Sequence, residues 1–561
     1  MATNLNTEEI NYQKLRGGYY TPPVIGQFLA DWAIRTRSDK VLEPSCGDGA
    51  MLMAAVHRLS ELGASFDQIS RHLQGVELDP EEAEKAQESL VKFGLPQHEV
   101  QVASEDFFRF RADNGLFTDR VSAQRSYDAV VGNPPFVRYQ NFPNESRTRA
   151  FEQMNRAGLN PNGHTNMWVP FLVLSALMLG PEGRFGMVIP AELFQVKYAA
   201  ETRKFLSRYF SQLTLITFEK LVFENIQQEV VLLLGEKGSV KHEGIRLIEL
   251  TDAQDLVSYQ HSDINSVEVK PLDHSKEKWT QYYLESSEID LLRKISARPE
   301  ITRTGEIYDV SVGVVTGKND FFILASEEAE SLGIQDSVTD IVTRSGHLRG
   351  VVFHQEDWSD NANKQLSSKL FQPENKPKSK LRARVQSYIN QGEEEEHHTG
   401  YKCRTRSPWY IVPSAWIPDA FMLRQVHSYP KLILNKAEAT CTDTIHRIEF
   451  YEGWGEKAEL VTSAFLNSLT FAAAEVRGRS YGGGVLTFEP SEGEGLPLPL
   501  QGAENLDLNK IDSLIREDDI ETVLEMNDQI LLVEGLGLSE REVASLRGIW
   551  KKMRDRRINR N

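Results

Sequence analysis

Acidic residues follow three successive apolar segments in the first part of the chain. Glu43 and Asp48 lie in the stretch VLEPSCGDGAML, Glu77 lies in GVELDP, and Asp106 lies in ASEDFF. Each apolar segment has the pattern of a short buried strand, and ligands of open α/β sheets bind at the carboxyl ends of strands. A carboxylate there can accept hydrogen bonds from ribose hydroxyls or from an adenine amino group. Because each acidic residue follows a predicted strand in the same way, we expect these residues to form one shared site. Separate roles as helix caps or surface charges are the alternative.

The glycine-rich turn after the first segment does not have the pattern of a phosphate-binding loop. Gly47 and Gly49 allow a sharp turn, and the helix that follows presents its free N–H groups. The chain has neither G-x-x-x-x-G-K nor a complete G-x-G-x-x-G at this position, so a ligand contacted by Glu43 and Asp48 is favoured over a phosphate. S-adenosylmethionine fits, because its sulfonium and ammonium groups are positive and it carries no phosphate.

A fourth segment, SYDAVVGNPPFVRY, ends in an asparagine, two prolines and an aromatic residue. Its run from Asp128 to Val131 is short, apolar and β-branched, which is typical of a buried parallel strand, and Gly132 ends it. The two prolines fix their own φ angles and hold the preceding Asn133 in an extended conformation. Asn133 is therefore predicted at the same edge of the sheet as the acidic residues.

The elements that position these residues alternate between strand-like and helix-like segments over residues 1–245, as in a doubly wound, mostly parallel α/β sheet. Beyond residue 245 the regular alternation fades, so residues 246–561 are predicted to form a second, mixed α+β domain with a helical end. The expected strands are 40–42, 73–76, 99–102, 127–131, 184–189, 213–218 and 229–234, and the clearest helices are 50–62, 80–93 and 168–179.

Composition indicates a globular protein of two or three domains among its 561 residues. No apolar run approaches the roughly 18 residues that a membrane span needs, and the amino terminus lacks the features of a signal peptide. The cysteines are scattered without metal or disulfide spacing, so we expect a cytoplasmic protein with no metal site.

The net charge of −18 taken alone argues against a nucleic-acid partner. Charge is segregated, however, because residues 376–384 and 551–560 are strongly basic. Each basic run can also be an ordinary solvated surface.

The order of these motifs resembles that of the gamma-class N6-adenine DNA methyltransferases of restriction-modification systems. GGYYTPP (Gly17–Pro23), VLEPSCGDG, GVELDP, SEDFF and NPPF occur in the order of the family, and the likeness continues through GRFGMVIPAELF and LVFENIQQEVVLLL. Later segments such as VGVVTGKNDFFIL, LILNKAEA and LNSLTFAAAEVRGRSYGGGVLTFEP resemble target-recognition portions of longer members. The resemblance implies a Rossmann-like class I methyltransferase domain followed by a target DNA recognition domain.

The resemblance also implies a set of cofactor contacts. S-adenosylmethionine would be the cofactor, S-adenosylhomocysteine its product, and no metal would take part. Glu77 would hold the ribose, and Asp106 would accept the adenine amino group. The full set of implied cofactor-binding residues is Thr21, Glu43, Ser45, Cys46, Gly47, Asp48, Gly49, Glu77, Asp106, Phe107 and Phe171.

Catalysis would fall to the motif from Asn133 through Pro134 and Pro135 to Phe136. If the Asn133 side-chain oxygen and the Pro134 carbonyl accept the two protons of an adenine amino group, the nitrogen lone pair becomes available for the methyl group. Phe136 and Phe223 would stack on the target base after it flips out of the duplex. Many members have tyrosine where this chain has Phe136, and that change retains stacking but removes any phenol hydrogen bond.

The implied partner is double-stranded DNA, bound in the cytoplasm at the nucleoid, and a separate cognate restriction endonuclease is the expected genetic partner. A fused nuclease is disfavoured because we find no nuclease motif before Gly17. Candidate DNA contacts in the second domain, each of which can instead be structural, are Thr316, Lys318, Asn319, Asn435, Lys436, Arg477, Arg479 and Tyr481.

Other acceptors present the same planar amino group. The fold and motif also suit cytosine N4, a guanine amino group of ribosomal RNA, or a glutamine of a release factor. A module that has lost catalysis and only binds DNA is a further alternative. The roughly 300 residues after the catalytic motifs favour DNA as the substrate. A large domain is needed to recognise a DNA sequence, whereas enzymes for the other substrates do not need one.

Overall fold

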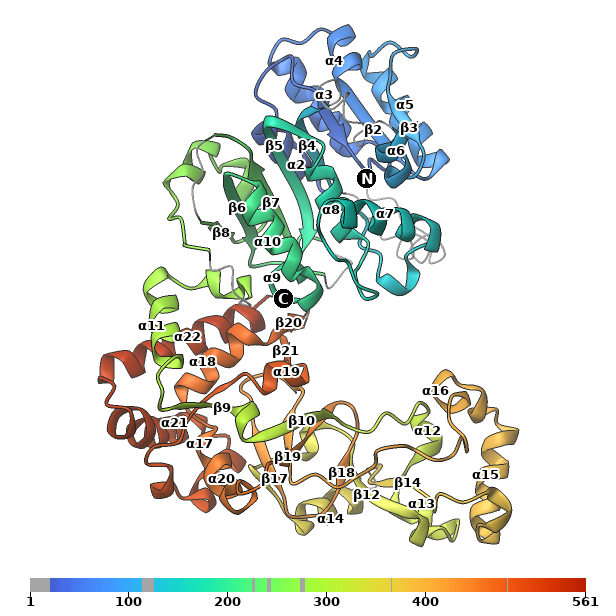
Figure 1. Ribbon diagram of the computed structural model, residues 1–561, viewed down its shortest axis with the longest axis vertical. Helices are drawn as coiled ribbons and strands as arrows, with labels where there is room; N and C mark the ends of the chain where they lie inside the picture. The colour runs from blue at the N-terminus through green and yellow to red at the C-terminus, as the bar shows by residue number, and fades with distance from the viewer. Residues whose placement is uncertain are drawn as a thin grey trace. The chain divides into compact units, whose positions relative to one another are not determined.

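The computed structural model describes residues 21–113, 126–223, 228–239, 244–272, 278–364, 366–481 and 483–560. The chain divides into two compact units, one reaching to Tyr283 and including Asn559–Asn561, and one spanning Leu284–Ile558 (Figure 1). This division falls later than the boundary predicted at residue 245. The physical reason is that strand β8 (Arg246–Leu250) pairs with the first sheet and so extends the first unit.

The first unit is built on an eight-stranded sheet in the order β3-β2-β1-β4-β5-β7-β6-β8. Strands β3 to β5 along this order pair in parallel, and β7 runs antiparallel to both β5 and β6. The predicted doubly wound, mostly parallel sheet is therefore confirmed. The strands are β1 Val41–Glu43, β2 Leu73–Glu77, β3 Val102–Ser104, β4 Tyr127–Gly132, β5 Leu179–Pro190, β6 Gln212–Phe218, β7 Val230–Glu236 and β8 Arg246–Leu250.

Helices cover this sheet, and two of them begin directly after strands that carry predicted site residues. Asp79 caps α5 by accepting hydrogen bonds from the N–H groups of Glu81 and Glu82. The predicted helix at 168–179 ends earlier, because Leu179 already pairs with Tyr127 in the sheet. The helices are α2 Pro23–Ala33, α3 Ala50–Glu61, α4 Phe66–His72, α5 Pro80–Phe93, α6 Phe107–Asp113, α7 Asn144–Arg156, α8 Trp168–Ala176, α9 Glu192–Gln195 and α10 Ala200–Tyr209.

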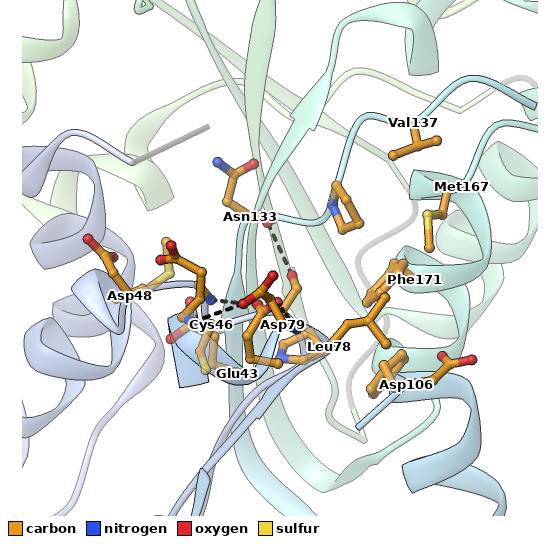
Figure 2. A pocket seen from close by; sticks show the side chains of 18 of the residues that line it. Glu43, Cys46, Asp48, Leu78, Asp79, Asp106, Asn133, Val137, Met167 and Phe171 are labelled. Carbon is orange, nitrogen blue, oxygen red and sulfur yellow. Dashed lines mark hydrogen bonds between the residues drawn. The ribbon is translucent and has the colours of Figure 1, made fainter. Parts of the chain in front are cut away.

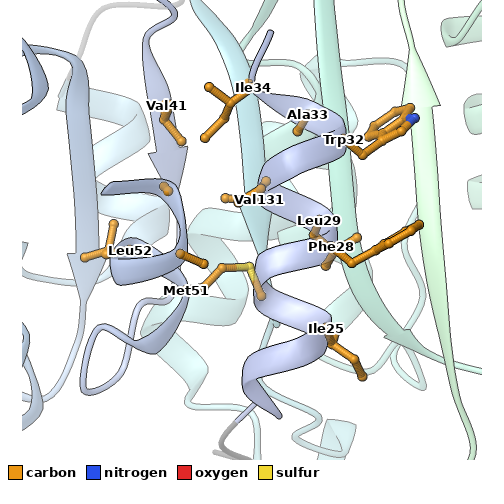
Figure 3. Close-up of a cluster of buried hydrophobic side chains, with 14 of the residues drawn as sticks. Ile25, Phe28, Leu29, Trp32, Ala33, Ile34, Val41, Met51, Leu52 and Val131 are labelled. Atoms are coloured by element: carbon orange, nitrogen blue, oxygen red, sulfur yellow. The ribbon is translucent and has the colours of Figure 1, made fainter. Parts of the chain in front are cut away.

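Helix α2 packs one apolar face onto the sheet and α3. Figure 3 shows Leu29 and Ile34 on the part of the helix near Val131 and Val41 of the sheet, and Ile25 belongs to the same buried cluster. Burying an aliphatic side chain of this size contributes about 1.5–3 kcal/mol each. Because α2 follows Thr21 directly, this packing fixes Thr21 beside the ends of the strands.

The second unit is mixed α and β. It contains sheets in the orders β10-β19-β15-β17-β13, β11-β14-β12-β18, β16-β21-β20 and β22-β9. Within this unit, Figure 1 shows α17, α18, α20, α21 and α22 gathered on one side and α12, α15 and α16 on the other. The predicted mixed α+β character is confirmed.

The elements of this unit are bounded as follows. The strands are β9 Ile301–Arg303, β10 Tyr308–Val312, β11 Ile323–Leu324, β12 Val338–Val342, β13 Val352–Phe353, β14 Lys369–Phe371, β15 Ala420–Leu423, β16 Gln425–Val426, β17 Leu432–Asn435, β18 Thr440–Cys441, β19 Ile445–Phe450, β20 Arg479–Tyr481, β21 Val485–Thr487 and β22 Pro497–Pro499. The helices are α11 Ser286–Ser296, α12 Asn319–Phe322, α13 Ser326–Ser331, α14 Gln355–Asn363, α15 Ala383–Glu394, α16 Tyr401–Arg404, α17 Ala458–Ala464, α18 Ser468–Arg477, α19 Pro490–Gly493, α20 Leu508–Arg516, α21 Ile520–Asp528 and α22 Glu540–Ile558. Across the described ranges, none of the helices is long and apolar enough to span a membrane.

Candidate active site

A cavity of about 380 Å³ lies at the carboxyl ends of β1, β2, β3 and β4. Glu43, Cys46 and Asp48 lie on one side of it, and Val137, Met167 and Phe171 lie on the other (Figure 2). Among the described residues that line the cavity there is no lysine or arginine. The acidic lining residues are Glu43, Asp48, Glu77, Asp79, Glu82, Glu105 and Asp106.

The carboxylate of Glu77 is held by backbone groups at the end of β2. Its Oε2 accepts a hydrogen bond from the Gly47 N–H at 2.8 Å, and its Oε1 accepts one from the Asp79 N–H at 2.9 Å. These bonds fix the side chain across the mouth of the glycine-rich turn. Glu77 lines the cavity, where a carboxylate can accept hydrogen bonds from ligand hydroxyls.

Gly49 is required by both backbone conformation and packing. Its φ of +89° lies in the left-handed region, and an added Cβ would lie 3.0 Å from Cα and Cβ of Ala86 on α5. Only glycine satisfies both conditions at low cost. The turn therefore brings α3 close to α5 and leaves Gly47 and Asp48 at the cavity.

Glu43 supplies a buried carboxylate on the cavity wall. Its side chain is 3% exposed, and none of the described residues donates a hydrogen bond to its Oε2. Burial, and then the nearby charges of Asp48 and Glu77, raise the pKa of Glu43 well above its usual value. Burial also raises the pKa of Asp48. A cationic ligand would reverse this cost, so the wall is suited to a positive group.

Asp106 is oriented by two helices. Its Oδ1 accepts a hydrogen bond from the Phe108 N–H at 2.9 Å, as a cap of α6. Its Oδ2 accepts from Ser146 Oγ at 2.7 Å and lies 3.4 Å from a guanidinium nitrogen of Arg149, both on α7. Sequence reasoning missed Ser146 and Arg149, because their contact with Asp106 depends on how α7 packs.

The opposite side of the cavity is apolar and aromatic. The rings of Phe107 and Phe171 stack with their centroids 5.1 Å apart and an interplanar angle of 18°. Leu78, which follows Glu77, lines the cavity and is 57% exposed. Its position directly after the glutamate of GVELDP is the signal by which sequence reasoning could have found it. This side suits a planar heterocycle.

Asn133 reaches the cavity from the end of β4 (Figure 2). Ser45 Oγ donates a hydrogen bond to its backbone carbonyl at 3.2 Å, and its Nδ2 donates to Thr21 Oγ at 3.2 Å. With the nitrogen used as donor, the side-chain oxygen is the acceptor end of the amide. Pro135 also lines the cavity.

The loop after the NPPF motif is held by a polar network. Asn166 Oδ1 accepts a hydrogen bond from the Tyr139 N–H at 3.0 Å, and the Met167 N–H donates to the Val137 carbonyl at 3.0 Å. Asn166 Nδ2 donates to Glu192 Oε2 at 3.1 Å and contacts the Tyr198 hydroxyl at 2.8 Å. The network ties the loop after the NPPF motif to α9, and sequence reasoning missed it.

Most of the predicted cofactor residues meet at this cavity. Phe136 and Phe223 do not line it; instead they pack in the hydrophobic cluster of the first unit, where Phe223 is buried and Phe136 is half-buried. Gly17–Tyr20 of the first motif and residues 224–227 of the last lie outside the described residues. The predicted residues that line the cavity are Thr21, Glu43, Ser45, Cys46, Gly47, Asp48, Glu77, Asp106, Phe107, Asn133, Pro135 and Phe171.

The candidate DNA contacts have mixed surroundings. Thr316 is buried, Asn435 uses its amide to bind the backbone carbonyls of Pro418 and Ala439, and Arg479 pairs with Glu492. The side chain of Tyr481 lies outside the described part of the chain. The side chains with exposed surface are Lys318, Asn319, Lys436 and Arg477.

The mostly parallel sheet, with helices packed on it, has the fold of S-adenosylmethionine-dependent methyltransferase domains. The model of the N-6 DNA methylase family matches residues 5–318, so the chain belongs to this family. The C-terminal domain of the type II methyltransferase M.Eco57I matches residues 276–532, which covers most of the second unit.

Curated relatives agree with this assignment, and solved structures share the fold. The chain is 22% identical to the type II methyltransferase M.AccI of Acinetobacter calcoaceticus over 91% of this chain and 90% of that protein. It is 25% identical to M.BstVI of Geobacillus stearothermophilus over 56% and 61% of the two chains. Its fold is similar to that of the type IIL restriction-modification enzyme MmeI in complex with DNA, with a TM-score of 0.58, 11% identity and coverage of 93% and 73%. The DrdV–DNA complex gives a TM-score of 0.52 at 12% identity, covering 90% of this chain and 57% of that one.

Proposed function

We propose that this chain transfers a methyl group from S-adenosylmethionine to the N6 amino group of an adenine flipped out of duplex DNA. Modification of its site would protect host DNA from a separate restriction endonuclease. The observation that carries the proposal is the position of Asn133 and Pro135 at the edge of an acidic cavity, at the end of the strand next to β1. The family match supports the same chemistry.

The cavity fits the cofactor. The buried, unpartnered oxygen of Glu43 and the carboxylate of Asp48 suit its cationic end, Glu77 suits the ribose hydroxyls, and Asp106 beside Phe171 suits the adenine. When bound, the cofactor supplies an electrophilic methyl group. The described lining of the cavity has no basic side chain, so it does not suit a ligand that carries a phosphate.

The chain's own residues prepare the acceptor. The Asn133 side-chain oxygen and the Pro134 carbonyl accept the two protons of the target amino group, which lets the nitrogen lone pair become available for bond formation. Ser45 and Thr21 hold Asn133, so little reorganisation is needed during the reaction. A strong general base is unnecessary, because the proton becomes acidic once the nitrogen carries the methyl group. Phe136 and Phe223 are the proposed stacking partners of the flipped base.

The reaction is tested by identifying the labelled product. Purified protein is incubated with methyl-tritiated S-adenosylmethionine and unmodified duplex DNA, and the DNA is digested to nucleosides. Label in N6-methyladenine supports the proposal. Label in N4-methylcytosine replaces the acceptor, and label only in RNA or protein refutes DNA as the substrate.

Cofactor binding should depend on pH through Glu43. Because burial raises the pKa of Glu43, this carboxyl stays protonated to a higher pH in the ligand-free protein than an ordinary glutamate does. The cation favours the charged form, so affinity for S-adenosylmethionine should rise with pH, by up to about tenfold per unit. The affinity is measured by isothermal titration calorimetry from about pH 5 to pH 7. In this range the amino group of the ligand stays protonated, so its own titration does not contribute.

The control for this pH dependence is Glu43→Gln. This variant should bind S-adenosylmethionine more weakly and lose most of the increase in affinity with pH. Any increase that remains would come from Asp48. A wild-type affinity that is independent of pH, or a variant with the full wild-type slope, would contradict the assignment.

A further inference from the structure

The two basic runs that stand out in the sequence are largely neutralised within the protein. Cations in residues 376–384 and 551–560 form ion pairs with acidic residues of the second unit, and one of these pairs is buried. A phosphate must displace such a carboxylate before it can use the cation. These runs therefore offer DNA less charge than their sequence indicates. The pairs are Lys376–Glu374, Lys378–Glu393, Arg382–Asp336, Lys551–Glu521, Lys552–Glu288 and Arg557–Glu475.

Helix α16 differs from both runs. Its Tyr401 is 68% exposed, and Lys402 and Arg404 are exposed beside it. Neither of these two cations forms an ion pair with any acidic residue that the structure describes. Lys402 Nζ lies 5.9 Å and Arg404 Cζ lies 5.5 Å from the centroid of the Tyr401 ring. The helix thus presents a phenol flanked by two available cations.

The turn Val315–Lys318 is joined firmly to α16. The guanidinium of Arg406 donates to the carbonyls of Thr316 and Val315, each at 2.7 Å. Gly317 has a φ of +83°, and a Cβ there would lie 2.6 Å from Cβ of Lys402, so only glycine allows this approach. Figure 1 places α16 next to α12, the helix that follows the turn. We call Tyr401, Lys402, Arg404 and the turn Val315–Lys318 the α16 surface.

Two of the four glutamates in the run before α16 bind other side chains. Of the acidic run before α16, Glu393 accepts from Lys378 and Trp409, and Glu395 accepts from Gln391 and His397. On the turn itself, Asp320 lies 3.8 Å from Lys318. Among the described residues, no acidic side chain forms an ion pair with Lys402 or Arg404, so both charges are available to a partner.

We propose that the α16 surface binds the phosphate backbone of duplex DNA, with Lys402 and Arg404 on phosphates and the Tyr401 hydroxyl donating to one of them. The inference rests on the proposed function, since it takes DNA as the substrate. Phosphate contacts fix the register of a protein on the duplex and carry no sequence information themselves. The α16 surface would thus position the DNA, while other residues of the second unit read its bases.

The test is the salt dependence of DNA binding by the full chain. Affinity for a fluorescein-labelled duplex is measured by anisotropy at several salt concentrations, for the wild type and for the double variant Lys402→Gln/Arg404→Gln. Loss of two phosphate contacts should lower the slope of log affinity against log salt by about 2 and weaken binding roughly tenfold at low salt. The matched control is Lys510→Gln/Arg541→Gln, which removes two exposed cations from α20 and α22.

The possible results separate this inference from the proposed function. A slope reduced only in the α16 variant, with affinity for S-adenosylmethionine unchanged, supports the inference. If wild type and α16 variant share one slope while both methylate DNA, the surface is refuted and the proposed function stands. An equal loss of slope in both double variants also refutes it, because the effect would then be one of net charge. If the wild type neither binds nor methylates DNA, both proposals fail together.

Discussion

Replacing Asn133 with alanine is expected to slow methyl transfer by about 10²- to 10³-fold, the range seen when one preorganised hydrogen-bonding group is removed from an active site. The variant loses the side-chain oxygen that we assign to the amino group of the target base. It keeps Glu43, Glu77 and the glycine-rich turn, so its affinity for S-adenosylmethionine should stay within about threefold of the wild type. Single-turnover transfer to DNA and calorimetric titration of the cofactor measure the two quantities separately.

Asn144→Ala is the matched control for this substitution. Asn144 lies at the start of α7, its side chain is exposed, and it does not line the cavity. Its variant should transfer methyl groups at the wild-type rate. The assignment fails if Asn133→Ala retains the wild-type single-turnover rate. It fails equally if cofactor affinity falls as far as the rate does, because Asn133 would then serve cofactor binding.

The central strands and their ends could be predicted because their determinants are local. The strand β4 ends at Gly132 because the two prolines that follow Asn133 cannot continue it. Glycine is required at position 49 because the turn there has a positive φ angle. Parallel strands bring their carboxyl ends to one edge, so acidic residues far apart in sequence were expected together, and the cavity contains them. Their individual roles remain predictions.

The domain boundary and the contacts around the site depend on packing between distant segments. This packing cannot be recognised from the pattern of a single sequence. Strand β8 has the same local pattern as a first strand of the second domain, and only its pairing with β6 assigns it to the first sheet. The contacts of Ser146 and Arg149 with Asp106 depend on where α7 lies. The polar network around Asn166 likewise joins residues that no motif connects.

That network leads to the second large expected effect. Asn166→Ala removes the acceptor of the Tyr139 N–H and the donor to Glu192, so the loop after the NPPF motif loses its fixed position on α9. A displacement of about 1 Å in a positioning element can cost about 10²-fold in rate. We expect a loss of this size in the single-turnover rate. Cofactor affinity should fall far less than the rate, because the acidic residues assigned to the cofactor lie in or directly after β1, β2 and β3, although Val137 and Met167 beside the network also line the cavity.

Tyr198→Phe separates positioning from a general structural role. It removes one hydroxyl from the same network but keeps the bonds of Asn166 to Tyr139 and Glu192, so its rate should fall by less than about tenfold. Thermal unfolding of both variants is measured beside the rates. If the two variants lose stability equally and lose rate equally, Asn166 acts only through stability. If the two variants lose stability equally but Asn166→Ala alone loses the rate while the cofactor still binds, the Asn166 side chain sets the position of the loop after the NPPF motif.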